Sequence, residues 1–394
     1  MHERALDGVK VVEIAEGVSG PFCGRILAGM GAEVVKIERP PGGDRSRREA
    51  PFLPGVAEPE SSALFLHLNS SKKSVTLDWQ SAEARPVFER LLPAAHLLIE
   101  NSPPGTLECH GLGFDALHST HPTLSVVSIT DFGSFGPYAD WIATPLVDLA
   151  LGGYLYLSGE EDREPLMLPG FQPDYVAGLH GYLGATLALW SLDETGEGRH
   201  VEVSAVESLA SMSQFTTVMH TYSNVVRRRH GNRWESEGGY ARHPITVLPC
   251  KDGHVSFSVA IEPQWEMLCA MIGRPDMLED SRYPTFDDRR KHADEIDAIL
   301  TAWLEDKTKQ EVFDMAAGIW SVPAARVSDL AEVLDDPQYR SRGLWSEVDH
   351  PVAGKYTQPT VPYQMRGTPP SFGRAPMLGE HNDEILRDRL GFDW

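Results

Sequence analysis

The sequence predicts an α/β fold, in which a Rossmann-like large domain on a parallel sheet is joined to a smaller α+β domain. Residues 9–17 (VKVVEIAEG) form a short apolar run rich in β-branched residues, which is typical of a buried parallel strand. The next segment, SGPFCGRILAGMGA, has helical character, and residues 33–40 (EVVKIERP) form a second strand that proline stops. Strand, helix and strand at this spacing predict a βαβ unit and therefore a doubly wound parallel sheet.

Further strands and one long helix follow. Apolar runs predict three more strands, at residues 73–79, 96–101 and 124–133. Residues 175–192 are almost entirely apolar or small and predict a helix, and residues 200–212 predict a strand followed by a helix. This alternation of strands and helices extends the parallel sheet across the first half of the chain.

A polar, charged stretch at residues 227–244 indicates the passage into a second domain. That domain is expected to begin with a hairpin, ITVLPCKDGHVSFSV, whose Asp-Gly pair at 252–253 is a strong turn signal. Amphipathic helices are expected between residues 264 and 317, and mixed, proline-rich segments follow. The expected boundaries are 1–225 for the first part of the large domain, 226–327 for the small domain and 328–394 for a return segment.

Composition excludes several classes of function. The chain has 394 residues, 41% of them hydrophobic, and a formal net charge of −22. Such acidity argues against the basic stripe of a nucleic-acid surface, so no nucleic-acid partner is expected. No apolar run is long enough to cross a bilayer and the N-terminal MHERALDGVK has no apolar signal-peptide core, so no membrane partner is expected. The four cysteines form no CxxC pair and are expected to be reduced thiols of a cytoplasmic protein.

The first turn, EGVSGP, raises a nicotinamide-dinucleotide hypothesis, because Glu38 ends the second strand where a ribose-binding acid would lie. The fingerprint G-x-G-x-x-G is missing, however: only Gly17 and Gly20 are present, and Pro21 removes an early helical N–H. The pattern favours a βαβ unit that serves as a scaffold or binds another nucleotide. The sequence also lacks the zinc-binding spacings HxxxH and HExxH, so no metal is expected.

Basic residues gather after the expected C-terminal ends of strands. Open α/β sheets bind ligands at this edge, and charged donors there suit phosphates or carboxylates. On an otherwise acidic chain, two such clusters favour anion binding over ordinary loop charge. They comprise Arg39, Arg45, Arg47 and Arg48 in IERPPGGDRSRR, and Lys72 and Lys73 in NSSKKS.

The stretch LPGFQPDYVAG places Asp174 between a proline and a helix of small residues. Locally, Asp174 is a favoured N-cap, because an aspartate oxygen accepts one of the unpaired N–H groups of the first turn. The alternative is a nucleophilic carboxylate, and the two roles are compatible. Gly178, Gly181 and Gly184 follow, although an interior glycine weakens a helix by about 0.8–1.0 kcal/mol relative to alanine. Another helix or a ligand chain is therefore expected to approach this helix closely.

Sequence blocks over nearly the whole chain carry a family resemblance. They are LDGVKVVEIAEGVSGPFCGRILAGMGAEVVKIERPPGGD, NSSKKSVTLDW, FGSFGPYAD, PDYVAGLHGYLGATLALWSLDETGEGRHVEVSAVES, RHGNRW, PCKDGHVSFSV, VPAARV, DDPQYRSRGLW and LGEHNDEIL. In these blocks the chain resembles the class III CoA-transferases, the CaiB/BaiF type that includes formyl-CoA transferase. The first and fourth blocks are very specific for this family.

The resemblance implies an enzyme that moves CoA from an acyl-CoA donor to a carboxylic acid acceptor through an aspartyl-CoA thioester. Asp174 matches the family's nucleophile, whose carboxylate attacks the thioester to give a mixed anhydride and CoA thiolate. An ordinary aspartate pKa of about 3.9 leaves the group ionised at neutral pH, and a helix N-terminus would keep it so. The family's contacts to coenzyme A match Gly17, Val18, Arg39, Leu68, Lys72, Lys73 and Asn101.

The resemblance also implies an interlocked homodimer in which the C-terminal segment completes the large domain. The chain departs from the family pattern at Ser102, where an aromatic residue usually lies against adenine, and at Cys109, where a basic residue is usual. SVAIEPQW stands where formyl-CoA transferase has a glycine-rich flap. These departures concern the adenine contact and the acceptor, and they leave Asp174 in place.

Three other functions are less consistent with the sequence. An acyl-CoA racemase of the same fold would carry a GHD-type motif, whereas the matching stretch ATPLVDLALGG has Thr144 and Pro145 and no histidine. A non-catalytic CoA-binding subunit is disfavoured by the retained Asp174, and a nicotinamide dehydrogenase by the missing glycine fingerprint. The sequence does not identify which acids would be exchanged.

Overall fold

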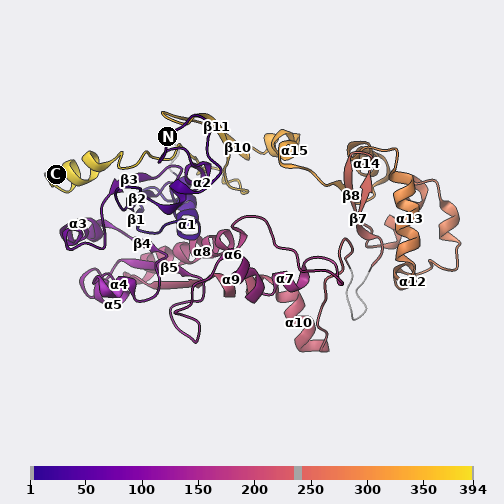
Figure 1. The fold of residues 1–394 in the computed structure, drawn as a ribbon, viewed down its shortest axis with the longest axis horizontal. Coiled ribbons are helices and arrows are strands. Elements are labelled where there is room, and N and C mark those ends of the chain that lie inside the picture. The colour runs from indigo at the N-terminus through magenta and orange to yellow at the C-terminus, as the bar shows by residue number, and fades with distance from the viewer. Residues whose placement is uncertain (1–3, 235–241, 393–394) are drawn as a thin grey trace. The chain divides into compact units, whose positions relative to one another are not determined.

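A six-stranded parallel sheet in the computed structural model confirms the predicted fold class (Figure 1). The structure describes residues 4–234 and 242–392. Within them the strands of this sheet pair in the order β3-β2-β1-β4-β5-β6, and helix α1 (Ser19–Gly29) joins the first two, as the βαβ prediction required. The strands are β1 (Lys10–Glu13), β2 (Glu33–Glu38), β3 (Lys73–Thr76), β4 (Leu97–Glu100), β5 (Ser125–Thr130) and β6 (His200–Ser204).

Helices cover both faces of this sheet, because successive side chains of a strand point to opposite faces. On one face, Val11 packs against α1 and α8 (Gln172–Thr195). On the other, Val12 packs against α3 (Arg85–Leu91), α5 (Phe114–Thr120) and a C-terminal π-helix (Asp383–Arg389). The remaining helices here are α2 (Ala63–Leu68), α4 (Thr106–Cys109), α6 (Pro145–Leu151), α9 (Ala205–Met212) and α16 (Pro337–Ser341).

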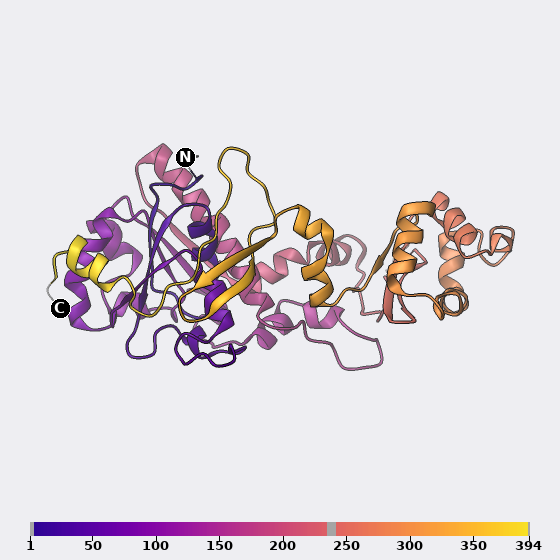
Figure 2. The same ribbon diagram turned by 90° about the horizontal axis from the view of Figure 1, so that it is seen from above.

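The C-terminal segment returns to the parallel sheet. Figures 1 and 2 show its last helix, in yellow, beside α3. Arg90 Nη1 on α3 donates to the Leu390 carbonyl at 2.5 Å, and Lys73 Nζ lies 2.6 Å from Glu384 Oε1. The hairpin β10 (Trp345–His350) and β11 (Gly354–Pro359) precedes this helix. The two ends of the chain therefore share one core.

Contacts divide the chain into two compact units. Unit 1 comprises Met1–Gly152, Leu168–Met212 and Asp336–Trp394, and unit 2 comprises Gly153–Met167 and Ser213–Asp335. The boundaries expected from the sequence, 1–225 and 328–394 for the large domain and 226–327 for the small domain, stay a prediction. None of the helices in the described part of the chain combines the length and apolar character that a membrane crossing needs.

Unit 2 has a sheet and a core of its own. The predicted hairpin is confirmed, with Cys250 of β7 (Ile245–Cys250) opposite Gly253 of β8 (Gly253–Ser258), and β9 (Ala324–Arg326) pairs with β8. Buried side chains such as Trp265 and Leu300 pack helices onto this sheet. Part of the connecting stretch 227–244 lies outside the described residues. The helices of unit 2 are α7 (Tyr154–Leu157), α10 (Gln214–Ser223), α11 (Glu262–Met271), α12 (Phe286–Lys291), α13 (Ala293–Leu304), α14 (Lys309–Met315) and α15 (Leu330–Asp335).

The glycines of α8 allow close packing inside unit 1. A Cβ atom at Gly178 would lie 2.5 Å from the Ser19 carbonyl oxygen of α1. At Gly181 and Gly184 it would lie 2.5 Å from Ile129 Cδ1 and 2.4 Å from Val201 Cγ1. Of the two alternatives left open by the sequence, the crossing helix and the underlying strands account for these positions. The helix carries residues 172–195, three more at each end than the pattern predicted.

Candidate active site

A cavity of about 540 Å³ opens at the C-terminal ends of β1, β4 and β5. The chain runs from β1 toward β3 on one side and from β4 toward β6 on the other, so the cavity lies at the switch point where open α/β sheets bind ligands. The first turns of α6 and α8 also contribute to its lining. Four of the predicted site residues line it: Gly17, Val18, Asn101 and Asp174.

The turn after β1 requires its glycine. Gly17 has a φ of +81°, a conformation that favours glycine, and Arg45 Nε lies close to it, 2.3 Å from where a Cβ atom would be. Asn101 holds the same turn from β4: its Oδ1 accepts the Glu16 N–H at 2.9 Å and its Nδ2 donates to the Glu16 carbonyl at 2.7 Å. Asn101 therefore orders the turn that lines the cavity.

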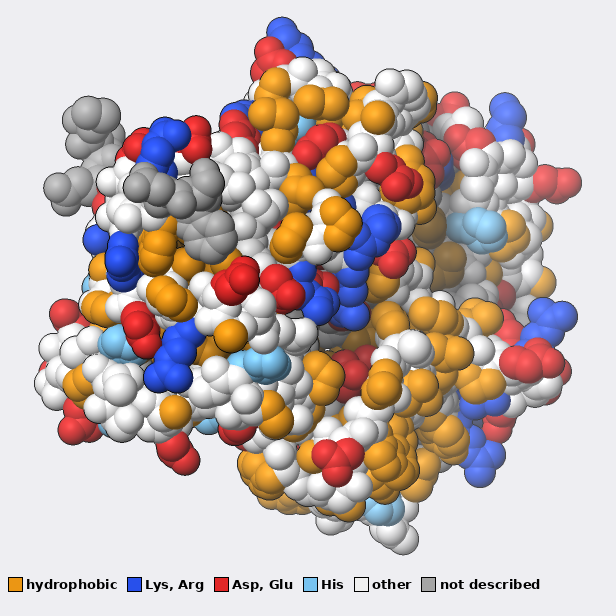
Figure 3. Space-filling view, turned by 60° about the vertical axis from the view of Figure 1, so that its left-hand side comes forward, with side chains coloured by type: hydrophobic (Ala, Val, Ile, Leu, Met, Phe, Trp, Pro, Cys, Tyr) orange, Lys and Arg blue, Asp and Glu red, His pale blue; other side chains and the backbone are white. Residues whose placement is uncertain are grey.

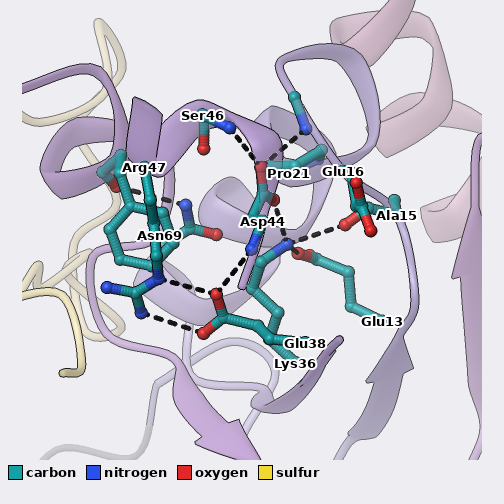
Figure 4. A network of polar contacts seen from close by, with 12 residues as sticks. Glu13, Ala15, Glu16, Pro21, Lys36, Glu38, Asp44, Ser46, Arg47 and Asn69 are labelled. Carbon is teal, nitrogen blue, oxygen red and sulfur yellow. Dashed lines mark hydrogen bonds and ion pairs between the residues drawn. The ribbon is translucent and has the colours of Figure 1, made fainter. Parts of the chain in front are cut away.

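The loop that carries Arg45 is anchored at Asp44 by a buried group of charges (Figure 4). Lys36 Nζ on β2 lies 2.9 Å from Glu13 Oε1 and 2.7 Å from Asp44 Oδ2, and all three side chains are fully buried. Asp44 Oδ1 in turn accepts the N–H groups of Gly17 at 2.9 Å and Ser46 at 2.7 Å. Burial favours a lower pKa for Lys36, but the charges of Asp44 and Glu13 outweigh it and raise that pKa. The loop that carries Arg45 is thus fixed by ion pairs.

Asp174 lies in the first turn of α8 but does not cap it. The N-cap position is Phe171 and no side-chain cap hydrogen bond is present, so the N-cap expectation is wrong. The position is half-buried. Burial raises the pKa of Asp174 to about 6, with the charge of Arg45 opposing and that of Asp131 adding to the rise. Burial therefore outweighs the charge of Arg45, although at a pKa of about 6 about nine-tenths of the Asp174 carboxyls stay ionised at neutral pH.

Four further carboxyl groups, which the sequence did not predict, line the cavity: Glu49, Asp131, Asp140 and Asp148. Asp148 on α6 is buried, and its Oδ1 accepts no hydrogen bond from any described residue. Burial, followed by the charges of Asp131 and Asp174, raises its pKa to about 7. Asp131 follows β5, and its Oδ2 accepts the Ala143 N–H at 3.1 Å. The sequence offered one signal for Asp148: it is the single acidic residue within the apolar run PLVDLAL. No group of described residues forms a metal site.

A second, smaller cavity of about 280 Å³ contains the predicted Arg39 together with Arg48. Arg39 Nε lies 3.2 Å from Glu16 Oε1 and is 44% exposed, so it can still meet a ligand. Arg47 of the same basic cluster is instead buried, with its Nε 2.7 Å from Glu38 Oε2. Figure 3 shows basic side chains in small groups among acidic ones on one face of the molecule. Arg39 and Arg48 share the smaller cavity with the carboxylates of Glu16 and Asp78.

Three of the predicted CoA contacts are not among the residues that line either cavity. Leu68 is fully buried on α2. Lys72 Nζ is buried and donates to both Glu13 oxygens, at 2.8 and 2.9 Å, and burial lowers its pKa to about 8 although Glu13 opposes this. Lys73 Nζ lies 2.9 Å from Glu33 Oε2 and 2.6 Å from Glu384 Oε1. Their role as CoA contacts stays a prediction.

Comparison with known proteins identifies the family. The family model described as CoA-transferase family III matches residues 6–382. The chain belongs to this family. A formyl-CoA:oxalate CoA-transferase of Rhodopseudomonas palustris (strain BisA53) is 32% identical to this family III member, over 99% of the chain and 94% of the relative. The succinyl-CoA–L-malate CoA-transferase beta subunit of Chloroflexus aurantiacus is 32% identical over 98% and 94%.

A solved structure agrees with this family III fold. The crystal structure of a CaiB/BaiF family protein from Brucella suis has a TM-score of 0.88 to the chain at 29% identity, covering 98% of this chain and 100% of the other. The family predicted from the sequence and the enzyme class, a CoA-transferase, are confirmed.

The buried charges predict a large effect of Glu13→Gln on stability. The substitution leaves Lys36 and Lys72 buried with one carboxylate fewer, which is expected to lower the free energy of unfolding by about 3–5 kcal/mol. Urea unfolding followed by circular dichroism measures the change. The matched control is Glu89→Gln, whose carboxylate pairs with Arg85 where both side chains are largely exposed, and no measurable loss is expected there. Equal losses in the two variants would contradict the role given to the buried group.

Proposed function

We propose that this enzyme transfers CoA between carboxylic acids through an aspartyl-CoA thioester on Asp174. The observation that supports the proposal is the half-buried Asp174 carboxyl in the cavity at the C-terminal edge of the sheet. A pKa of about 6 leaves it ionised at neutral pH yet more basic than an ordinary aspartate. A group of this kind suits nucleophilic attack on a thioester.

The proposed reaction balances without a cofactor other than coenzyme A. An Asp174 oxygen forms a bond to the carbonyl carbon of the acyl-CoA donor, and the carbon–sulfur bond breaks with its electron pair on sulfur. The CoA thiolate then attacks the side-chain carbonyl carbon of Asp174, and the donor acid leaves as a carboxylate. The acceptor carboxylate repeats these steps in reverse. No net proton transfer is needed.

We propose that coenzyme A spans the two cavities. Its phosphates would meet the guanidinium groups of Arg39 and Arg48, and the uncharged pantetheine arm would pass Gly17, Val18 and Asn101 toward Asp174. This division is supported by charge, because the Asp174 cavity contains several carboxyls and suits the uncharged part of the molecule. Curated relatives are named for oxalate and malate, and from them we carry to this chain only the substrate class, carboxylic acids.

Asp174 is expected to form a covalent adduct with a suitable acyl-CoA. Incubation with a panel of acyl-CoA thioesters, followed by intact mass measurement and hydroxylamine trapping, should place the adduct on Asp174. Asp174→Asn should abolish the adduct and lower turnover about 10³-fold or more, because it removes the attacking oxygen. Asp193→Asn, at the exposed far end of α8, serves as the control. The acylation rate should fall as pH decreases through about 6, where Asp174 gains a proton.

The same experiment separates the alternatives. The proposal would be contradicted if Asp174→Asn kept full activity and no thioester gave a covalent adduct with the wild-type protein. An acyl-CoA racemase would instead exchange the α-hydrogen for deuterium, and this is disfavoured because no histidine is among the described residues that line the Asp174 cavity. A non-catalytic subunit would bind CoA without turnover.

Arg39→Gln is expected to weaken binding of CoA thioesters without changing the chemical step. Loss of one charge-assisted hydrogen bond should raise KM about tenfold while kcat stays close to that of the wild type. Steady-state kinetics with CoA and dephospho-CoA thioesters would locate the phosphate that Arg39 meets. Arg85→Gln removes an arginine from an exposed pair on α3 and is the control. An unchanged KM for both thioesters would remove Arg39 from the binding site.

We propose a homodimer in which the exposed face of α8 is covered by a second copy of the chain. Leu179, Leu183, Leu187 and Trp190 recur at helical spacing and are 51%, 55%, 53% and 66% exposed. Such a continuous apolar stripe is a characteristic feature of an interaction surface. The opposite face of the helix, including Ala177 and Ala185, is already buried in unit 1. The interlocked arrangement and a cytoplasmic location also stay proposals.

Charges placed in this stripe should break the dimer. The double variant Leu183→Glu, Leu187→Glu is expected to be monomeric at micromolar concentration, because each desolvated carboxylate opposes burial. Size-exclusion chromatography with light scattering measures the mass. Leu330→Glu changes a leucine that is 86% exposed on α15 and should leave the mass unchanged. A wild-type monomer, or a double variant that remains dimeric, would contradict the proposed surface.

A further inference from the structure

The cavity around Asp174 carries an unusual balance of charges. Among the described residues that line it, five side chains carry carboxyl groups and one carries a guanidinium. They are Glu49, Asp131, Asp140, Asp148 and Asp174, with Arg45 as the cation. The charge of Arg45 already acts on Asp174. A ligand that brings a second carboxylate into this cavity would therefore meet mainly like charges.

Asp148 is the buried carboxyl among these charges. Only 3% of its surface is exposed, it lines the cavity, and its Oδ1 lacks a hydrogen-bond partner among the described residues. It is therefore a buried carboxyl beside the cavity, with one oxygen that no described residue satisfies. When ionised, it repels a nearby carboxylate, and when protonated, it donates one hydrogen bond.

The uncharged part of the lining combines polar residues such as Asn101 and Thr130 with an apolar, partly aromatic group. Phe132, Trp141 and Ile142 come from the loop after β5, and Phe171 precedes α8. Tyr138 stacks on Trp141 with ring centroids 4.3 Å apart, which supports the indole from behind. Trp141 and Ile142 are 57% and 89% exposed, so they offer apolar area that an acyl group can cover.

We propose that the acids exchanged by this enzyme are monocarboxylates with an uncharged apolar or aromatic body, and that Asp148 is a specificity-determining residue that disfavours dicarboxylates. The proposal rests on the proposed function, since it concerns the acyl group attacked by Asp174. An apolar body gains from the aromatic wall, whereas the second carboxylate of a diacid must lose water beside Asp148 and Asp131.

This proposal fixes the sign of a pH effect. Asp148 gains negative charge as pH rises through about 7, so discrimination against a second carboxylate should increase with pH. The charged groups near it are Asp131 after β5, Asp174 in the first turn of α8, and Arg45. Helices α8 and α9, which pack against α6, also carry the titratable side chains His180 and Glu207, and neither of these lines the cavity. Asp174 must be ionised to attack any of the thioesters, so the fraction of ionised Asp174 enters every rate and cancels in a ratio of rates.

The test compares single-turnover formation of the Asp174 adduct by intact mass. The matched substrates are succinyl-CoA and its methyl ester, which differ in one charge, together with benzoyl-CoA. The methyl ester and benzoyl-CoA are expected to react at least about 100-fold faster than succinyl-CoA at about pH 8, and the preference should shrink about tenfold at about pH 6. Equal rates for succinyl-CoA and its methyl ester would overturn the substrate class. Absence of an adduct with every thioester would instead reject the proposed function.

The variant Asp148→Asn tests the contribution of the Asp148 charge to substrate preference. It is expected to lower the preference at about pH 8 by about tenfold and to remove the pH dependence of the ratio, because the amide cannot ionise. Glu207→Gln, the same change at an exposed position of α9 outside the cavity lining, should leave the ratio and its pH dependence intact. An unchanged ratio in Asp148→Asn would remove Asp148 as the determinant. The pH dependence of the wild-type ratio tests the same point without a variant.

Discussion

The buried ion pairs of Glu13, Lys36 and Asp44 are the constraint on which the site depends. Charges without access to water are tolerated only when they are paired, so the ends of β1 and β2 and the loop after β2 have one satisfactory arrangement. That arrangement presents the N–H of Gly17 to Asp44 and anchors the loop that carries the following Arg45. Lys72 closes the group from the segment before β3. Strands β1 and β2, the start of β3 and the first turn are therefore tied together before any ligand binds.

The two neighbouring cavities differ in their balance of positive and negative side chains. Arg39 and Arg48 line the smaller one together with Glu16 and Asp78, so its charges are balanced, whereas five carboxyl groups and one guanidinium line the larger one around Asp174. A molecule with phosphates at one end and an uncharged thioester at the other matches this difference in charge better than a molecule charged throughout. Burial raises the pKa of Asp174 and Asp148 within the acidic cavity, so the same desolvation tunes the nucleophile and makes a further negative charge costly there.

Much of the fold could be predicted because its signals are local. The apolar runs at β1, β2 and β4 were visible, as were the Asp-Gly turn of the β7–β8 hairpin and the helix after Asp174. The position and the partner of each basic residue could not be predicted from the sequence. Arg45, Arg47 and Arg48 stand together in the sequence, yet one lines the Asp174 cavity, one is buried on Glu38 and one lines the smaller cavity. Their partners come from distant segments, which no local pattern reports.

By itself, the sequence determined the parallel α/β fold, the family and the aspartate at the start of α8, because strand patterns and family motifs are written in consecutive residues. Only the tertiary structure decided that Asp174 lies in the first turn without capping it, that Lys72 faces Glu13, and that Asp148 and Asp131 share the cavity with Asp174. The physical reason is that burial and charge pairing arise between elements far apart in the chain. A carboxyl's pKa and its neighbours follow from that assembly.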